Sequence, residues 1–337
     1  YDNFFSRSYT YAPQTNRLTQ ILTPGYFFPV TSDASGNLTG AAAALTQEYE
    51  YDSLSQLRRA YPAGSSGTTT ALYDFNPFGE RARKQTSNGS VTQVTLYSYL
   101  PDGKLLGETI YDNNVLAEQR DYVWIDAAPV AMHVTKLDTA GVPTADRIYY
   151  LHSDHLGTPR RATNAAGATV WVVHGDEHFF FGEMWVENYA DAPISPINLR
   201  FPGQYYDAET GLNYNYFRSY WPLAGRYAQS DPIGLAGGLN TYLYVGGNPL
   251  RSTDPFGLAP FEVFGTEEAA RADRADFSRL LSEREGRLDV ILSRLFEGPG
   301  PWDWGRLTDV FPVDTSNDTS CSIGFVYSWI DYPPPIT

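Results

Sequence analysis

The sequence contains a single cysteine, Cys321, among its 337 residues, so no disulfide bond can form within the chain. It has no apolar run near the roughly 18 residues that a membrane-spanning helix needs. Its first residues, from Tyr1 onward, lack the charged and apolar segments of a signal peptide. The sequence also begins without methionine, and we therefore expect it to be part of a longer protein.

Positive charge is scarce as well. Lys and Arg number 24 against 39 Asp and Glu, which gives a formal net charge of −15. Proteins that bind nucleic acid contact the phosphate backbone through clustered Lys and Arg. The sequence has no such cluster, so we expect no direct nucleic-acid binding, and the acidity favours solubility.

Aromatic residues are abundant, at 15% of the sequence with 25 tyrosines. Together with frequent Gly and Pro, they favour short strands joined by tight turns. Residues 1–150 contain a loose repeat with a spacing of roughly 20 to 28 residues. Each unit consists of an aromatic strand, a turn with Asp, Asn or Gly, and a second strand. One hairpin cannot bury its face alone, so the repeat predicts neighbouring hairpins joined into one long sheet. The repeats include Tyr51-Asp52, Tyr73-Asp74, Tyr97-Ser98 and Tyr111-Asp112.

The phrase Asp-Pro-x-Gly-Leu occurs twice, at residues 231–235 and 254–258. Two carboxylates held close together cannot both ionise cheaply, so one of them keeps its proton. One aspartate then serves as an acid and the other as a base, which is sufficient to activate a water on a peptide carbonyl. We therefore take Asp231 and Asp254 as candidate catalytic residues, and a strand between them can bring both turns to one end of a sheet.

The same phrase is also a good turn, which leaves a purely structural interpretation open. Asp accepts hydrogen bonds from nearby backbone N–H groups, Pro presets φ, and Gly adopts positive φ. Arg226, which follows Gly225, is a candidate for a supporting role in which it pairs with an aspartate or orients a carbonyl. A salt bridge at the edge of the core is the alternative interpretation of Arg226.

Histidines near acidic residues raise the question of a metal. His152, Asp154 and His155 are close in sequence, and His174 and His178 follow them. Zinc needs three or four converging ligands. Successive residues of a strand face opposite sides, so His152 and Asp154 share a face and His155 points away from them. We expect neither a metal nor another cofactor, and no Gly-x-Ser-x-Gly segment indicates a serine nucleophile.

The Tyr-Asp pairs followed by a turn resemble the YD repeats of Rhs proteins and of the C components of Tc toxins. Residues 149–160 are similar to a recurrent Rhs phrase, and residues 200–258 resemble the Rhs core-associated module. The resemblance covers residues 1–258 and implies a strip of β-hairpins that spirals into a hollow shell around a cargo. It also implies that Asp231 and Asp254 perform autoproteolysis, once and in cis, between Leu258 and Ala259.

The sequence thus predicts an all-β fold in three parts, with a short α-containing tail. Residues 1–199 form the YD-repeat shell, residues 200–258 the autoproteolytic module, and residues 259–337 the variable C-terminal tail. The small-residue stretches 35–44 and 64–70 are predicted to be turns or loops. In the tail, Thr266 is a plausible helix N-cap, and apolar residues recur at helical spacing after it.

The tail has neither His nor Lys, which excludes histidine-based nuclease chemistry and a lysine nucleophile within it. The resemblance implies that this tail is the enclosed cargo of a secreted or delivered bacterial effector, often a toxin. The implied partners are this tail, an N-terminal remainder, an immunity protein, and a secretion-system spike or chaperone. Two alternatives remain open: a non-cleaving structural shell that binds carbohydrate through its tyrosines, and a tail that is an enzyme by itself.

Overall fold

The computed structural model describes residues 7–23, 25–41, 47–64, 70–174, 181–189, 192–258 and 261–262. The chain divides into two compact units, Tyr1–Leu281 and Ser282–Thr337, and all described residues belong to the first. They contain strands and three short 3-10 helices but no α-helix, so the all-β class predicted from the sequence is confirmed. None of these helices is long and apolar enough to span a membrane. The helix predicted in the tail lies outside the described residues.

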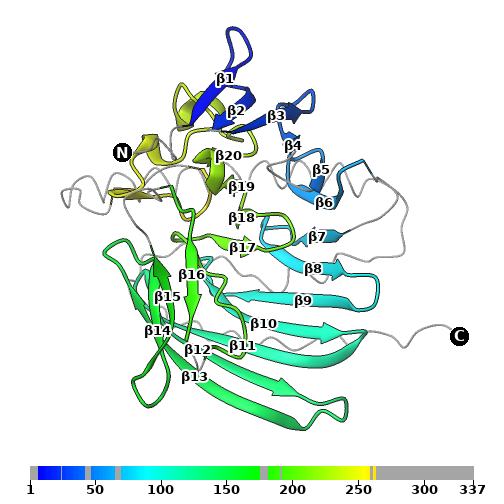
Figure 1. Cartoon of the computed structure of the whole chain (residues 1–337), viewed down its shortest axis with the longest axis vertical. Coiled ribbons are helices and arrows are strands. Elements are labelled where there is room, and N and C mark those ends of the chain that lie inside the picture. Colours follow the sequence, from blue (N-terminus) through cyan, green and yellow to red (C-terminus); the bar gives the residue numbers. More distant parts are fainter. Residues whose placement is uncertain are drawn as a thin grey trace, which may run out of the picture. The chain divides into compact units, whose positions relative to one another are not determined.

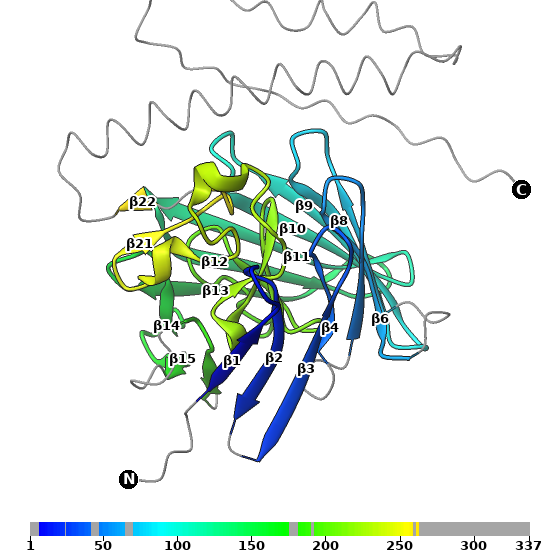
Figure 2. The same ribbon diagram turned by 90° about the horizontal axis from the view of Figure 1, so that it is seen from above.

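Sixteen strands form one sheet in which each strand pairs antiparallel with the next along the chain (Figure 1). This is the arrangement that the hairpin repeats predicted. Figure 2 shows the sheet curving around the yellow-green strands of a second, smaller sheet. The strands are β1 Ser8–Tyr11, β2 Leu18–Thr23, β3 Tyr26–Ser32, β4 Leu38–Ala41, β5 Gln47–Tyr51, β6 Leu57–Pro62, β7 Ala71–Phe75, β8 Arg81–Ser87, β9 Thr92–Tyr99, β10 Leu105–Asp112, β11 Val115–Ile125, β12 Ala128–Leu137, β13 Pro143–Ser153, β14 Pro159–Thr163, β15 Thr169–His174 and β16 Trp185–Asn188.

Many of the hairpins share one five-residue connection, which we call the Asx loop. Its first residue is Asp or Asn, and its fourth has positive φ. In the Asp154 loop, the Asp154 N–H donates to the Thr158 carbonyl at 2.9 Å, and Asp154 Oδ1 accepts the Thr158 N–H at 3.0 Å. The carboxylate therefore supplies an acceptor for a backbone N–H group that the tight turn would leave unpaired. The same two bonds close the loops that begin at Asp33, Asp52, Asn76, Asp138 and Asn164.

The tyrosines of the repeat point into the core. Tyr49 and Tyr73 are 2% and 1% exposed, and their hydroxyls donate to the Thr210 carbonyl and to Glu209 Oε1, at 2.9 and 2.8 Å. A buried tyrosine needs such a partner for its hydroxyl. These two tyrosines pack inside the fold, so they are not part of a surface that could bind carbohydrate.

A second sheet has four strands, β17 Tyr205–Asp207, β18 Leu212–Asn215, β19 Arg218–Trp221 and β20 Arg226–Tyr227. It is joined to the first sheet by charge as well as by apolar packing. Asp207 accepts from Arg81 Nη1 at 2.6 Å and from Lys84 Nζ at 3.0 Å, and all three side chains are buried. Removing one partner of such a buried group leaves an uncompensated charge, so these ion pairs fix how the sheets meet.

The concave side of the first sheet contains a cavity of about 500 Å³, beside residues 192–198. Glu108, Arg120 and Tyr205 line it, and Tyr205 Oη donates to Glu108 Oε2 at 2.8 Å.

The prediction that residues 35–44 form a turn or loop was wrong for part of this stretch. Within 35–44, residues Leu38–Ala41 form β4, whose Leu38 and Ala41 are buried, because their apolar side chains join the core rather than a loop.

Candidate active site

Each Asp-Pro-x-Gly phrase begins with a buried aspartate that lies after a strand. Asp231 closely follows β20, and Asp254 directly follows β21 Ser252–Thr253. Asp231 is 7% exposed and Asp254 is 1% exposed. Asp231 Oδ1 accepts the Ile233 N–H at 3.0 Å, so its side chain also shapes the local turn. The turn interpretation and the paired-acid interpretation therefore apply to the same residues.

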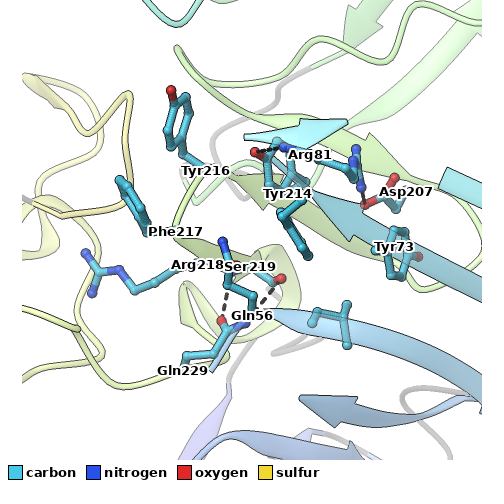
Figure 3. A pocket seen from close by; sticks show the side chains of 12 residues that line it. Gln56, Tyr73, Arg81, Asp207, Tyr214, Tyr216, Phe217, Arg218, Ser219 and Gln229 are labelled. Carbon is cyan, nitrogen blue, oxygen red and sulfur yellow. Dashed lines mark hydrogen bonds and ion pairs between the residues drawn. The ribbon is translucent and has the colours of Figure 1, made fainter. Parts of the chain in front are cut away.

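Arg218 joins the two carboxylates. From β19, its Nη1 lies 2.9 Å from Asp231 Oδ2, and its Nη2 lies 3.2 Å from Asp254 Oδ2. Figure 3 shows this side chain pointing away from Arg81 and Asp207, toward the yellow loop. The guanidinium also lies 3.5 Å from the centre of the Tyr227 ring. The planar guanidinium holds two acids in a fixed geometry, which the flexible point charge of a lysine ammonium does not reproduce.

Asp254 has further donors around it. Tyr227 Oη donates to Asp254 Oδ2 at 2.7 Å, and Asn215 Nδ2 donates to the Asp254 carbonyl at 3.0 Å. Burial raises the pKa of both carboxyls, although Arg218 opposes it, and the pKa of Asp231 reaches about 6. A carboxyl with a pKa near 6 exchanges its proton near neutral pH, as acid–base catalysis requires.

The Asp254 phrase forms an Asx loop that lacks one of its two closing bonds. Asp254 Oδ1 accepts the Leu258 N–H at 3.0 Å, and Gly257 has φ +67°, as in the hairpins of the first sheet. Among the described residues, however, no group donates to the Leu258 carbonyl, whereas the corresponding carbonyl of every other Asx loop accepts from its own first residue. Arg218 Nε instead donates to the Gly257 carbonyl at 2.5 Å.

The loop is held at both ends. β21 pairs with β22 Phe261–Glu262 through Ser252↔Glu262 and Thr253↔Phe261, so Leu258 lies in the connection between two paired strands. Upstream of Leu258, the Phe217 N–H donates to the Phe256 carbonyl at 3.3 Å. Ala259, the predicted residue after the cut, lies outside the described residues.

Arg226 contacts a backbone carbonyl and two aromatic rings. Its Nη2 donates to the Asn16 carbonyl at 2.6 Å, and its guanidinium lies over the rings of Tyr11 and Tyr242. Burial without a carboxylate partner lowers its pKa. Among the described residues, Arg226 forms no ion pair with Asp231 or Asp254, and Arg218, which the sequence did not single out, pairs with both.

The histidine-rich segment forms ordinary strand-edge and turn contacts. His152 Nε2 lies 3.1 Å from Thr163 Oγ1, and His155 Nε2 lies 2.9 Å from the Leu250 carbonyl. Asp154 shapes its Asx loop and pairs with Arg160 Nε at 2.8 Å. In the part of the chain that the structure describes, no group of three or more His, Cys, Asp or Glu side chains is arranged to hold a metal.

The fold and site define a YD-repeat protein, in which Tyr-Asp hairpins build one long sheet around a tyrosine-rich second sheet. The family model of the RHS protein matches residues 148–177. Double-stranded DNA deaminase toxin A of Burkholderia cenocepacia is 40% identical over 136 residues, or 40% of this chain and 9% of that protein. Toxin protein Tse5 of Pseudomonas aeruginosa is 42% identical over 127 residues, or 37% of this chain and 9% of that protein.

A solved structure shares the fold. The Tc holotoxin pore of Photorhabdus luminescens aligns with 78% of this chain and 14% of its own, with a TM-score of 0.57 and 21% identity. The RHS family model and the two related toxins support an Rhs-family protein. The matched segments span only about a tenth of the length of the two curated toxins.

Proposed function

We propose that this chain is the C-terminal part of a toxin-associated Rhs shell, a delivered bacterial effector that encloses residues 259–337 as cargo and cleaves itself between Leu258 and Ala259. The observation that carries the proposal is the single guanidinium of Arg218 bound to both aspartates, at the loop that presents Leu258. The two related toxins and the Tc structure support the toxin association. An immunity protein, an N-terminal remainder and a delivery spike or chaperone are the proposed partners.

The proposed reaction is hydrolysis of one peptide bond. Asp254, in its ionised form, takes a proton from a water that attacks the Leu258 carbonyl carbon. Asp231, in its protonated form, donates to the carbonyl oxygen as the negative charge develops there. Collapse of the adduct breaks the bond to the Ala259 nitrogen, which takes the proton that Asp254 removed from the water, while a hydroxyl of the adduct returns a proton to Asp231. The products are a carboxyl group on Leu258 and an amino group on Ala259, and the consumed reactant is one water.

Proximity accounts for cleavage in cis. The scissile segment is held by the Asp254–Leu258 hydrogen bond and by β21 and β22 on either side of the loop. Fixing the reacting groups in this way replaces an encounter with a separate substrate. The fold therefore acts once on itself, and we expect no turnover on added peptides.

Purified chain that has folded should separate on a denaturing gel into two fragments, and the smaller should begin at Ala259. N-terminal sequencing and intact mass identify the cut. Spontaneous hydrolysis of the acid-labile Asp-Pro bonds would instead give fragments that begin at Pro232 or Pro255, so the two routes are distinguishable. A chain that stays intact after folding contradicts the proposal.

The cleavage rate should depend on pH through Asp231. Because the protonated carboxyl is the proposed acid and burial raises its pKa to about 6, the rate constant should fall about tenfold per pH unit above that value. Full-length chain recovered in urea from inclusion bodies can be diluted into buffers from pH 5 to 8, and the loss of the full-length band followed with time. A rate that increases with pH through this range would contradict the assignment of Asp231 as the acid.

A further inference from the structure

The 3-10 helix η2, Gly234–Gly237, ends beside the paired aspartates. A methyl group built on Gly237 would overlap Asp231 Oδ2, and it would lie 2.9 Å from Asp231 Cγ and 3.3 Å from the Leu258 carbonyl oxygen. The backbone of Gly237 is therefore in contact with the Asp231 carboxylate and close to the Leu258 carbonyl. Three groups from separate turns meet at this one point.

Backbone conformation does not require glycine at this position. The neighbouring Gly234 and Gly238 have φ +64° and +123°, which favour glycine, whereas Gly237 lies outside the positive-φ region. A methyl group on Gly234 or Gly238 would meet nothing within 4 Å. Gly234 and Gly238 thus serve the turn, whereas the need for glycine at 237 comes from the space that Asp231 and Leu258 occupy.

We infer that Gly237 is a positioning residue for the self-cleavage: its missing side chain lets the Asp231 carboxyl approach the Leu258 carbonyl. The inference rests on the proposed function. Asp231 cannot move far without losing Arg218 Nη1 or the Ile233 N–H, which hold its two oxygens. A methyl group at 237 therefore displaces either the acid or the carbonyl from the reacting geometry.

Gly237→Ala should slow cleavage by about 100-fold, the effect of misplacing reacting groups by about 1 Å. The pH midpoint of the residual rate should also shift, because the contact between Asp231 and Arg218 changes, and a merely structural role would leave that midpoint in place. Refolding from urea followed by a gel time course measures both quantities. Leu235→Ala, on the exposed face of the same 3-10 helix, is the matched control and should cleave at the unmodified rate.

Stability is measured separately in the background Asp231→Asn, which should remain uncut. Adding Gly237→Ala to that background should lower the Tm by no more than about 4 °C, which corresponds to a small overpacking cost. A larger loss, or failure to fold, would assign Gly237 a structural role and overturn the inference. Cleavage of Gly237→Ala at the unmodified rate would also overturn it and leave the proposed function intact. An unmodified chain that never cleaves would refute the proposed function itself.

Discussion

Asp231→Asn should leave a single full-length chain after folding, with the cleavage rate lowered by at least about 100-fold. Asparagine has nearly the same shape as aspartate, and its amide oxygen can still accept the Ile233 N–H that Asp231 Oδ1 accepts at 3.0 Å. What it cannot do is exchange a proton near neutral pH. The turn is kept while the proposed acid is lost, and intact mass after refolding measures the result.

Asp254→Asn should also prevent cleavage, and the Asx loops provide a structural control for it. Asn76 and Asn164 occupy the same first position of such loops, and their side-chain oxygens accept the fifth N–H at 3.0 Å. Asparagine can therefore keep the bond of Asp254 Oδ1 to the Leu258 N–H, while its amide nitrogen replaces the Oδ2 that accepts from Arg218 and Tyr227. An uncut Asp254→Asn chain would indicate lost chemistry, because the turn itself accepts the substitution.

Asp138→Asn is the matched control for both variants. Asp138 begins an exposed Asx loop and accepts the Val142 N–H at 2.9 Å, far along the sequence from either phrase. This variant should cleave at the unmodified rate. If Asp231→Asn were still cut after Leu258 at a comparable rate, the paired-acid mechanism would be wrong, and another group would have to activate the water.

The repeat architecture could be predicted because its determinants are local. In a unit such as 49–52, a tyrosine lies on the buried face and an Asx residue begins the loop, and both consequences follow from a few consecutive residues. The buried hydroxyl of Tyr49 and the loop at Asp52 show the two parts of one such unit. The sequential pairing of neighbouring strands then needs no long-range information.

The partner of the two aspartates could not be predicted in the same way. Arg218 and Arg226 lie on adjacent antiparallel strands, and which of them reaches Asp231 depends on the register between β19 and β20. That register is set by the connection at η1, Pro222–Ala224, and a shift of one residue would turn each side chain to the opposite face. The sequence gives one usable signal, since Arg218 is a charged residue only two positions before the aromatic pair Tyr220-Trp221 of the same strand.

Arg218→Gln should both abolish cleavage and destabilise the fold by about 3–5 kcal/mol, the cost of leaving buried charges without their partner. Arg218 has 2% of its side chain exposed and is bound to Asp231 and Asp254. At that scale the Tm should fall by roughly 10 °C. Arg218→Lys should recover part of the stability but little cleavage, because one ammonium cannot hold both acids in the same geometry.

The loss of stability in Arg218→Gln should depend on pH. The direction of this dependence identifies Asp231 and Asp254 as its source. Burial already raises the pKa of Asp231 and Asp254 in the folded state, and removing the cation raises them further. The folded state then binds more protons than the unfolded chain, so stability falls as pH rises from about 4 through the folded-state pKa values. The variant should therefore be more stable at pH 5 than at pH 7.5 in thermal unfolding. Arg226→Gln, whose arginine is buried against a carbonyl and two rings, should show no comparable dependence, and equal behaviour of the two variants would contradict the assigned role of Arg218.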